Sequence, residues 1–436
     1  MKVCQLYAVI GDPILHSRSP LLFSGAFRRL RLRAAYTRLA SDSAGEAIAL
    51  AKELGLAGFN ITSPYKQEIA ALVDRLDDVA AELDAVNTVM ARDGRLEGFN
   101  TDPPGLLGAL RSGGFSPAGK RAVVIGAGGA AKAAAYALRQ AGAAHVLLAN
   151  RTPAKAEATA ALLGCEAAAL SAIPDALRRA DLLISCLPAH INVVESDWLD
   201  PKLVVLDANY AASPLSEAAR ARGCRVISGL AWLLHQALAS FRLFTGRRAP
   251  AAEMEAALNR STAPRDRLRS GVALIGFMGA GKTTVGQLLA ARLGVSFRDL
   301  DQDIERSEGR SVAEIFRTKG EAAFRKMERE MLADVPFADG EIVACGGGVI
   351  HDPINRRRLR KNAVVIWLSA PLETCLSREV NGARPLLADA EGCANAGELL
   401  ARRTPFYAET ADLVVDTGRR SRAAVVKKIA DELREA

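Results

Sequence analysis

Short apolar runs alternate with amphipathic stretches along this chain of 436 residues. In the first hundred residues, the apolar runs Tyr7–Ile10 and Gly58–Ile61 predict buried strands. Apolar positions at helical spacing predict helices near 20–30, over 66–73 and over 77–83. Strands that alternate with helices in this way are typical of α/β domains with parallel sheets.

The same alternation continues to the end of the chain. Apolar runs and helical spacing predict further elements, namely strands over 121–125, 145–149, 182–185, 204–207 and 225–227 and helices over 232–244 and 251–259. The polar, proline-interrupted segment 261–270 predicts a linker, and the apolar run Val272–Ile275 begins a second series of strands and helices. The sequence therefore predicts α/β domains over 1–104, 105–231 and 271–436, with helices near 232–260 completing the first.

Composition and cysteine content narrow the class of protein. Half of the residues are hydrophobic and 5% are aromatic, which suits well-buried sheets and argues against a disordered chain. No apolar run reaches the ~18 residues that a membrane helix requires. Because a strand-like segment follows Met1 almost at once, we expect no signal peptide. Seven scattered cysteines without a C-x-x-C pair argue against a disulfide framework and a zinc site. We therefore expect a cytoplasmic protein without a membrane partner.

The formal net charge of +8 is unevenly distributed. Residues 271–436 carry 25 Lys and Arg against 24 Asp and Glu, so nearly all of the excess lies in the first 270 residues. The basic residues are dispersed without interleaved aromatic residues, which argues against a nucleic-acid partner. Attraction of phosphorylated cofactors and carboxylate substrates is sufficient to explain the excess.

A phosphate-binding loop follows the predicted strand Val272–Ile275. The segment from Gly276 to Thr283 fills every position of G-x-x-x-x-G-K-[ST], in which backbone N–H groups surround nucleotide phosphates at a helix N-terminus. The motif predicts that Lys282 reaches the β- and γ-phosphates and that Thr283 holds Mg²⁺. The predicted ATP-binding residues are Gly279, Ala280, Gly281, Lys282, Thr283 and Thr284.

A second glycine-rich loop lies between the strand 121–125 and its helix. It fits G-x-G-x-x-[GA] and predicts that a dinucleotide binds to Gly126, Ala127, Gly128, Gly129 and Ala130. About 20 residues further on, NAD enzymes usually carry an acidic residue, whereas this chain has Asn150, Arg151 and Thr152, followed by Lys155. Two cations favour the 2′-phosphate of NADPH, to whose site we also assign Gly229. The open alternatives are a turn that is glycine-rich for packing alone and a solvated helix start.

Four polar clusters in the first hundred residues lie where predicted strands end or helices begin. They span residues 11–20, 60–66, 85–88 and 98–102, and loops at such places converge at one edge of a sheet. Together with the dinucleotide loop, these clusters make the chain resemble shikimate dehydrogenase over about 1–260. Two strand-end loops depart from the family pattern, Ser185–Pro188 and Ala208–Ala212.

The resemblance implies roles for residues of this half. Lys66 and Asp102 would form the proton-transfer pair beside the carbon that changes oxidation state, since reduction of a carbonyl by hydride requires a proton at the developing alkoxide. Ser17 and Ser19 would hold the substrate carboxylate, with Tyr210 near it. The remaining implied residues would bind ring hydroxyls or hold neighbouring loops, and they are Asn60, Thr62, Asn87 and Gln236.

Residues 271–436 resemble shikimate kinase. The resemblance rests on the phosphate-binding loop, Asp299 to Asp303, Gly320 to Glu328, Gly346 to Gly348, Arg384-Pro385 and Arg402-Arg403. It implies that Asp301 orients or deprotonates the substrate hydroxyl and that Asp299 supports Mg²⁺ through water. It also implies roles for several arginines and glycines: Arg325 and Arg403 would clamp the carboxylate, Gly347 and Gly348 would line the substrate floor, Arg384 would stabilise the transferring phosphoryl group from a lid, and Arg378 would stack on adenine.

The two resemblances imply consecutive reactions on one metabolite. We expect a substrate-binding α/β domain, a Rossmann domain that binds NADP, and a P-loop domain like those of nucleoside monophosphate kinases. The expected cofactors are NADPH or NADP⁺, ATP and Mg²⁺, and we expect a monomer or weak homodimer. One alternative is a quinate-preferring or NAD-linked dehydrogenase. Another is a degenerate dehydrogenase half that regulates an active kinase, motivated by the two altered loops.

Overall fold

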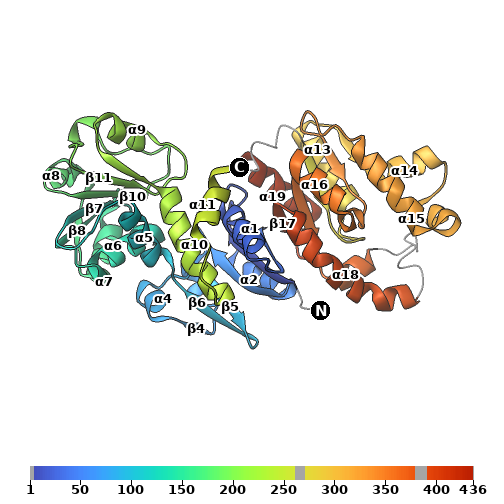
Figure 1. Cartoon of the computed structure of the whole chain (residues 1–436), viewed down its shortest axis with the longest axis horizontal. Coiled ribbons are helices and arrows are strands. Elements are labelled where there is room, and N and C mark those ends of the chain that lie inside the picture. Colours follow the sequence, from blue (N-terminus) through green and yellow to red (C-terminus); the bar gives the residue numbers. More distant parts are fainter. Residues whose placement is uncertain (1–3, 261–270, 379–389, 436) are drawn as a thin grey trace. The chain divides into compact units, whose positions relative to one another are not determined.

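The computed structural model describes residues 4–260, 271–378 and 390–435 and has an α/β fold with parallel sheets, as expected (Figure 1). Its contacts divide the chain into two compact units. The first unit contains the segment up to Tyr65 and the segment from Ala257 onwards, and the second unit is Lys66–Ala256. The predicted linker 261–270 lies outside the described residues, and the domain boundaries expected from the sequence remain predictions.

The main sheet of the second unit is parallel throughout. In the described chain its strand order is β12-β11-β10-β7-β8-β9. The strands are β7 (Arg121–Ile125), β8 (His145–Ala149), β9 (Glu166–Ala168), β10 (Leu182–Ser185), β11 (Val204–Asp207) and β12 (Arg225–Ser228). Because successive strands build outward from β7 in both directions, the order reverses between β7 and β10. Ligands of doubly wound sheets bind in the crevice at this reversal.

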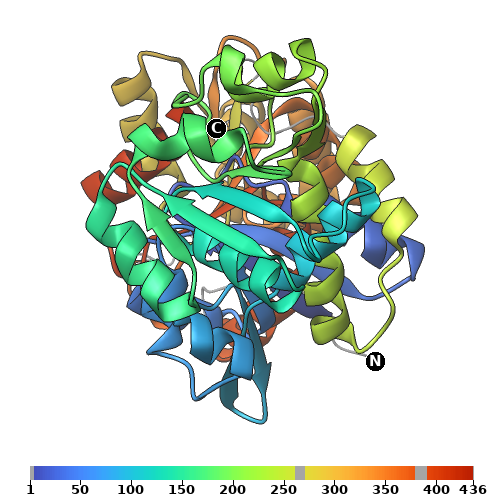
Figure 2. The same cartoon turned by 90° about the vertical axis from the view of Figure 1, so that its left-hand side faces the viewer.

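Both faces of this sheet are covered. Successive residues of each strand enter opposite cores, so Val124 and Ile184 belong to one apolar cluster and Val123 and Leu183 to the other. Figures 1 and 2 show the helices on the two sides of the strands. The helical segments are α5 (Asp102–Ser112), α6 (Gly129–Gln140), α7 (Pro153–Leu163), η1 (Leu170–Ala172), α8 (Ile173–Leu177), η2 (Ser196–Trp198), α9 (Pro214–Ala221) and α10 (Gly229–Thr245).

The second unit also contains a small β-structure that the sequence pattern did not predict. Strands β5 (Thr88–Arg92) and β6 (Arg95–Phe99) form an antiparallel hairpin, and β4 (Arg75–Leu76) pairs in parallel with β6. The hairpin turn places Asp93 and Gly94 at positive φ of 50° and 76°. Two short helices precede it, α3 (Lys66–Ala70) and α4 (Asp78–Leu83), and α11 (Ala251–Arg260) ends this part of the chain.

The strands of the first unit follow the order β14-β15-β13-β16-β17-β2-β1-β3 among the described residues, and their pairings are parallel. The strands are β1 (Gln5–Gly11), β2 (Ala34–Ala40), β3 (Leu56–Ile61), β13 (Val272–Ile275), β14 (Phe297–Asp299), β15 (Ile342–Ala344), β16 (Val364–Ser369) and β17 (Leu413–Asp416). The helical segments are α1 (Ser19–Arg29), α2 (Ala44–Glu53), α13 (Lys282–Leu293), α14 (Leu300–Glu308), α15 (Val312–Ala333), η3 (Val349–His351), α16 (Pro353–Asn362), α17 (Leu372–Ser377), α18 (Ala390–Thr410) and α19 (Arg422–Arg434).

Strand β2 was not predicted because its buried residues are partly polar. Thr37 and Arg38 are 2% and 3% exposed, which interrupts the apolar run that marks a strand. Both side chains have backbone partners, since Thr37 Oγ1 donates to Ala411 O over 3.4 Å and Arg38 Nη1 donates to Asp412 O over 3.0 Å. These partners are more than 370 residues away, so no local pattern could have shown that the polar residues are satisfied.

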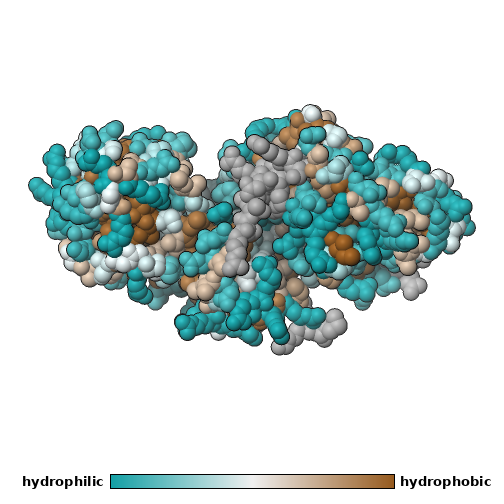
Figure 3. All heavy atoms as spheres, turned by 45° about the horizontal axis from the view of Figure 1, so that its top comes forward, coloured by the Kyte–Doolittle hydropathy of each residue, from teal (hydrophilic) through white to brown (hydrophobic). Residues whose placement is uncertain are grey.

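The surface seen in Figure 3 is mostly hydrophilic, with separate hydrophobic patches. The large hydrophobic side chains that are exposed come from distant places in the sequence, such as Leu72, Leu162 and Ile354. Scattered residues of this kind are ordinary on a folded surface. Within the described ranges, no helix is both long and apolar enough to span a membrane.

Candidate active sites

The dinucleotide loop of the second unit connects β7 to α6. The backbone N–H of Gly126 donates to Ala149 O over 2.8 Å, which fixes the end of β7 against β8. Gly128 caps α6 and Gly129 begins it, with Ala127 and Ala130 half-buried beside them. A methyl group on Gly129 would lie 3.6 Å from Cδ of Lys66, so the predicted proton donor lies beside the loop. A helix N-terminus here suits a pyrophosphate.

The residues predicted to read the ribose follow β8 at the same edge of the sheet. Arg151, Thr152 and Lys155 are exposed at the start of α7, and Asn150 Nδ2 donates to Thr152 O over 3.1 Å. The two cations therefore remain available to a bound anion. Gly229 follows β12 directly and begins α10, and its N–H donates to Asn209 O over 3.2 Å.

Lys66 and Asp102 form a direct ion pair within the second unit. Lys66 Nζ lies 2.5 Å from Asp102 Oδ2, and the two side chains are 19% and 9% exposed. Asp102 is the first residue of α5, where the helix dipole favours a carboxylate. Its backbone N–H donates to Asn100 Oδ1 over 3.1 Å, and Trp232 Nε1 donates to its carbonyl over 2.9 Å. The carboxylate is thus held in place and can orient the ammonium group.

Asn87 joins this pair to its surroundings. Its Nδ2 donates to Asp102 Oδ1 over 2.8 Å and to Gln236 Oε1 over 3.0 Å. Its Oδ1 accepts the backbone N–H of Thr101 over 2.8 Å. Three hydroxyl groups also belong to this hydrogen-bond network, those of Thr88, Thr101 and Ser240. Their roles were not predicted from the sequence. Lys66, Asn87, Asp102 and Gln236 are therefore one connected cluster.

The two strand-end loops that depart from the family pattern support each other. Asn209 Nδ2 donates to Leu187 O over 3.0 Å and to Asp207 Oδ1 over 2.7 Å. This side chain bridges the loops after β10 and β11 at the edge where the glycine loop lies. Tyr210, which we expected near the substrate carboxylate, is 39% exposed.

In the first unit, the other predicted dehydrogenase residues lie at the ends of β1 and β3. Ser17 and Ser19 are each 6% exposed, and their hydroxyl oxygens are 3.4 Å apart. Asn60 Oδ1 accepts the hydroxyl of Tyr36 over 2.7 Å. Thr62 N donates to Ile10 O over 2.9 Å, which brings the loop after β3 against the end of β1. Their contact with a substrate remains a prediction.

The phosphate-binding loop lines a pocket of about 230 Å³ in the first unit. Gly279 has a φ of +74°, and a Cβ atom there would lie 2.2 Å from Cys375 O, so only glycine fits. The lining includes all of the predicted ATP-binding residues that the structure describes, namely Gly279, Ala280, Gly281, Lys282, Thr283, Thr284 and Arg378. Arg384 lies outside the described residues.

The side chains of this pocket fit a nucleotide with Mg²⁺. Lys282 is 9% exposed and donates to Gly276 O and Phe277 O over 3.1 and 3.0 Å. Thr283 Oγ1 donates to Asp299 Oδ2 over 2.6 Å, so a hydroxyl and a carboxylate oxygen meet at the loop. Oxygen ligands of this kind suit Mg²⁺, which commonly takes one or two protein oxygens and keeps several waters.

The sequence missed the side of the pocket that follows β17. Thr417, Arg420 and Arg422 line it, and Thr417 Oγ1 donates to Ala280 O over 3.0 Å. Arg378 Nη2 donates to Thr417 O over 2.7 Å, which connects it to the same loop. The available signal was a pair of arginines just after an apolar strand, where loops of parallel sheets carry ligand-binding residues.

A second cavity of the first unit contains the predicted shikimate-binding residues of the kinase half. Its lining is Met278, Asp301, Val312, Phe316, Phe324, Arg325, Glu328, Gly347, Gly348 and Arg403. A Cβ atom on Gly348 would lie 2.2 Å from Arg325 Nη1, so glycine is needed for the guanidinium to occupy its place. Arg325 pairs with Glu328 over 3.0 Å and with Glu321 over 3.1 Å. All five predicted substrate residues of this half therefore meet in one place.

Arg403 is 1% exposed and reaches this cavity from α18. Its Nε donates to His351 Nε2 over 2.9 Å, while its Nη1 has no hydrogen-bond partner among the described residues. Burial and the positive charge of Arg403 lower the pKa of His351 to about 4, so the imidazole is neutral at pH 7 and accepts this hydrogen bond. Because a buried guanidinium group requires partners, the free Nη1 suits a carboxylate ligand. His351 was not predicted.

The two units thus contain a Rossmann-type dinucleotide site with a lysine–aspartate pair and a P-loop phosphotransferase site. Family models match both parts of the chain: the shikimate dehydrogenase substrate-binding domain matches residues 9–89, shikimate/quinate 5-dehydrogenase matches 110–205, and the shikimate 5′-dehydrogenase C-terminal domain matches 229–258. The shikimate kinase model matches residues 278–434. The chain belongs to the shikimate dehydrogenase family and carries a shikimate kinase domain in addition.

Similar proteins agree with the assignment of the first half. An NADP⁺-dependent shikimate dehydrogenase of Moorella thermoacetica is 42% identical over 273 residues, which cover 58% of this chain and 92% of the relative. The solved structure of Thermus thermophilus shikimate 5-dehydrogenase with NADP(H) and shikimate is 33% identical with a TM-score of 0.55, and covers 59% of this chain and 99% of that one. Quinate dehydrogenase of Corynebacterium glutamicum with NAD is 29% identical with a TM-score of 0.56, over 60% of this chain and all of that one.

Burial of Glu328 generates a testable pH dependence. Its side chain is 1% exposed, and burial raises its pKa to about 7 against the opposing effect of Arg325. Above pH 7 the carboxylate is charged, partly neutralises Arg325 and repels an incoming substrate carboxylate. We expect the KM for shikimate in the kinase reaction to rise about 3- to 10-fold between pH 6 and pH 8.

The Glu328→Gln variant should flatten this profile, because its side chain does not titrate. Glu330→Gln is the matched control, since Glu330 is exposed on the same helix and pairs with Lys326. Initial rates at saturating ATP measure the KM, and the KM for ATP in the same series reports general effects of pH. If the KM for shikimate of the unchanged protein does not vary between pH 6 and pH 8, Glu328 and Arg325 do not act on the substrate carboxylate as predicted.

Proposed function

We propose that this chain is a bifunctional enzyme of the shikimate pathway. It reduces 3-dehydroshikimate to shikimate with NADPH and then transfers the γ-phosphoryl group of ATP to the 3-hydroxyl of shikimate. The observation that carries the proposal is the presence of two separate nucleotide sites whose families share shikimate as an intermediate. Each assignment supports the other, because the product of the first reaction is the substrate of the second.

In the reduction, NADPH supplies the hydride. Lys66 supplies the proton to the oxygen that becomes the alcohol, and Asp102 holds the ammonium group in place through their ion pair. Asn87 fixes the orientation of Asp102 through its amide. Ser17 and Ser19 hold the substrate carboxylate. The remaining predicted residues bind the ring hydroxyls or lie near the carboxylate, namely Asn60, Thr62, Gln236 and Tyr210.

In the phosphorylation, Arg325 and Arg403 clamp the carboxylate of shikimate, because a planar guanidinium binds a carboxylate with two parallel hydrogen bonds. Asp301 orients the attacking hydroxyl and accepts its proton. Lys282 stabilises the charge on the β- and γ-phosphates. Thr283, whose hydroxyl donates to Asp299, would hold Mg²⁺, and Asp299 would support the ion through water. Arg384 adds positive charge to the transferring phosphoryl group, and Arg378 lies against the adenine.

We further propose a cytoplasmic enzyme that is a monomer or weak homodimer and binds no nucleic acid. The dispersed basic residues and the absence of a C-x-x-C pair support this setting. The alternative of a degenerate or quinate-preferring dehydrogenase half rests on the loops Ser185–Pro188 and Ala208–Ala212. The hydrogen bond between these loops favours an ordered, working site over a degenerate one.

The combined reaction gives the most direct test of the proposed function. The purified chain, supplied with 3-dehydroshikimate, NADPH, ATP and Mg²⁺, should consume NADPH and form ADP, with shikimate 3-phosphate as product. Absorbance of NADPH and a coupled assay of ADP follow both reactions in one sample, and the final amounts should be equal. If ADP forms only when shikimate is added and NADPH is not consumed, the dehydrogenase half is degenerate and the proposal is wrong.

Two lysine substitutions should separate the activities. Lys66→Ala should lower the dehydrogenase kcat about 10²- to 10⁴-fold, because it removes the proton donor, and should leave the kinase unchanged. Lys282→Ala should lower the kinase kcat about 10²-fold or more and spare the dehydrogenase. Lys120→Ala is the control, since this lysine pairs with Asp181 at the surface. Equal loss of both activities in either lysine variant would refute two independent sites.

The cofactor preference depends on the cations after β8. Arg151→Asp should shift the ratio of kcat/KM for NADPH and NADH about 10- to 100-fold toward NADH, because a charged hydrogen bond to the 2′-phosphate is replaced by repulsion. Arg178→Asp is the control at an exposed site paired with Asp175. An unchanged ratio in Arg151→Asp would show that the 2′-phosphate is bound elsewhere.

A further inference from the structure

The last helix of the kinase half, α19, carries two buried charged residues on consecutive turns. Lys428 is 6% exposed and Glu432 is 1% exposed. The apolar residues Val425, Val426 and Ile429 of the same helix pack in the core, as expected for an amphipathic helix. Charged side chains are almost never so completely buried unless they have partners. Their partners lie in the first 42 residues of the chain, within the same unit.

Glu432 holds the loop that connects β1 to α1. Its Oε2 accepts the backbone N–H of Ile14 over 2.8 Å and that of Leu15 over 2.9 Å. Both residues are fully buried, so the two N–H groups have no access to water. The carbonyl of Ile14 in turn accepts the N–H of Ser17 over 2.9 Å. One carboxylate oxygen therefore fixes the turn from which Ser17 and Ser19 project.

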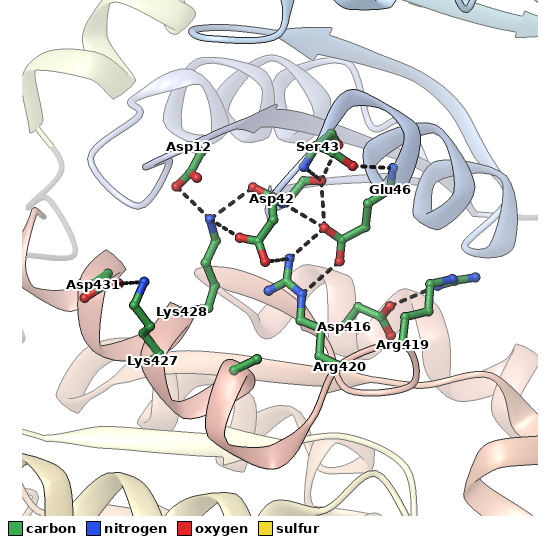
Figure 4. A network of polar contacts seen from close by, with 12 residues as sticks. Asp12, Asp42, Ser43, Glu46, Asp416, Arg419, Arg420, Lys427, Lys428 and Asp431 are labelled. Atoms are coloured by element: carbon green, nitrogen blue, oxygen red, sulfur yellow. Dashed lines mark hydrogen bonds and ion pairs between the residues drawn. The ribbon is translucent and has the colours of Figure 1, made fainter.

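Two cationic side chains, Lys428 and Arg38, bind the residues on either side of this turn. Lys428 Nζ lies 2.6 Å from Asp12 and 3.0 Å from Asp42, and it donates to Ser41 O over 3.0 Å (Figure 4). Arg38 Nε donates to Ser17 O over 2.8 Å, and its Nη1 donates to Asp412 O, a carbonyl of the kinase half. The loop is thus attached to the kinase half at Asp12, at residues 14–15 and through Ser17.

The buried N–H groups of Ile14 and Leu15 require an acceptor such as the Glu432 carboxylate. The acceptor must be negative or strongly polar, because two adjacent N–H groups converge on it inside the protein. Burial raises the pKa of Glu432, while the N–H groups of Ile14 and Leu15 and the charge of Lys428 lower it and Asp12 raises it. The family models of the dehydrogenase end at residue 258, so Glu432 lies outside the part of the chain that they match.

We propose that Glu432, a residue of the kinase half, is a positioning residue of the dehydrogenase. It holds residues 12–17 in the shape that presents the hydroxyl groups of Ser17 and Ser19 to the substrate carboxylate. This inference rests on the proposed function, in which these serines bind that carboxylate. It follows that residues of both halves build the dehydrogenase substrate site of this chain.

The test uses the full chain and the oxidation of shikimate by NADP⁺ without ATP. Glu432→Ala removes the acceptor of two buried N–H groups and should raise the KM for shikimate about 10-fold, with kcat and the KM for NADP⁺ within about 2-fold. Glu432→Gln keeps an oxygen at the same place and should restore most of the affinity. Lys427→Ala is the matched control, because this exposed lysine of α19 pairs with Asp431 on the same helix.

Kinase kinetics of each variant separate positioning from a general loss of structure. If Glu432→Ala loses both activities, the milder variant Glu432→Asp tests the inference. It keeps the charge but withdraws the oxygen from the loop. We expect it to raise the KM for shikimate in the dehydrogenase reaction and to leave the kinase activity intact. If Glu432→Ala and Glu432→Asp both have the same KM for shikimate as Lys427→Ala, the inference is wrong, while the proposed function still stands. No oxidation of shikimate by the unchanged protein would instead overturn the proposed function, and the inference with it.

Discussion

Parallel strand pairing is the constraint on which both candidate sites depend. Strands that run in one direction deliver their following loops to one edge of a sheet, where helices then begin. In the second unit this rule places the loops after β7, β8, β10 and β11 together, and in the first unit it does the same for those after β13, β14, β15 and β17. Helix N-termini at such an edge suit phosphate groups, which explains why each unit has a nucleotide site.

Both sites also contain buried charged side chains, and in each site a network of ion pairs and hydrogen bonds surrounds them. Asp102 is surrounded by Lys66 and the Asn87 amide, and Arg325 has Glu321 and Glu328 beside it. Removing a charge from water is costly unless opposite charges or hydrogen bonds replace the water. The networks therefore fix side-chain orientation as well as charge, and Arg403 Nη1 is left without a hydrogen-bond partner in the described part of the chain.

The attachment of the kinase half to the first 65 residues uses the same two principles. Strand β17 pairs in parallel with β2, so the strands of both segments follow one another in a continuous order. Around this pairing, Lys428, Arg420 and Glu432 of the kinase half are buried against carboxylates and backbone groups of the other segment. A fused chain makes such contacts permanent, because the two segments never separate by diffusion. This gives a physical reason for a kinase residue to support a dehydrogenase loop.

The sequence alone determined those features that depend on neighbouring residues. The two glycine loops and the strands before them follow from local spacing, because a tight turn next to phosphate restricts the residue type at each position. The resemblance of each half to its family likewise rests on motifs of neighbouring residues. The tertiary structure alone decided strand β2, the acceptance of a hydrogen bond by His351, the arginines after β17 and the role of Glu432. Each of these depends on partners tens to hundreds of residues away in the sequence, and a buried polar residue is acceptable only when folding brings its partner within hydrogen-bond distance.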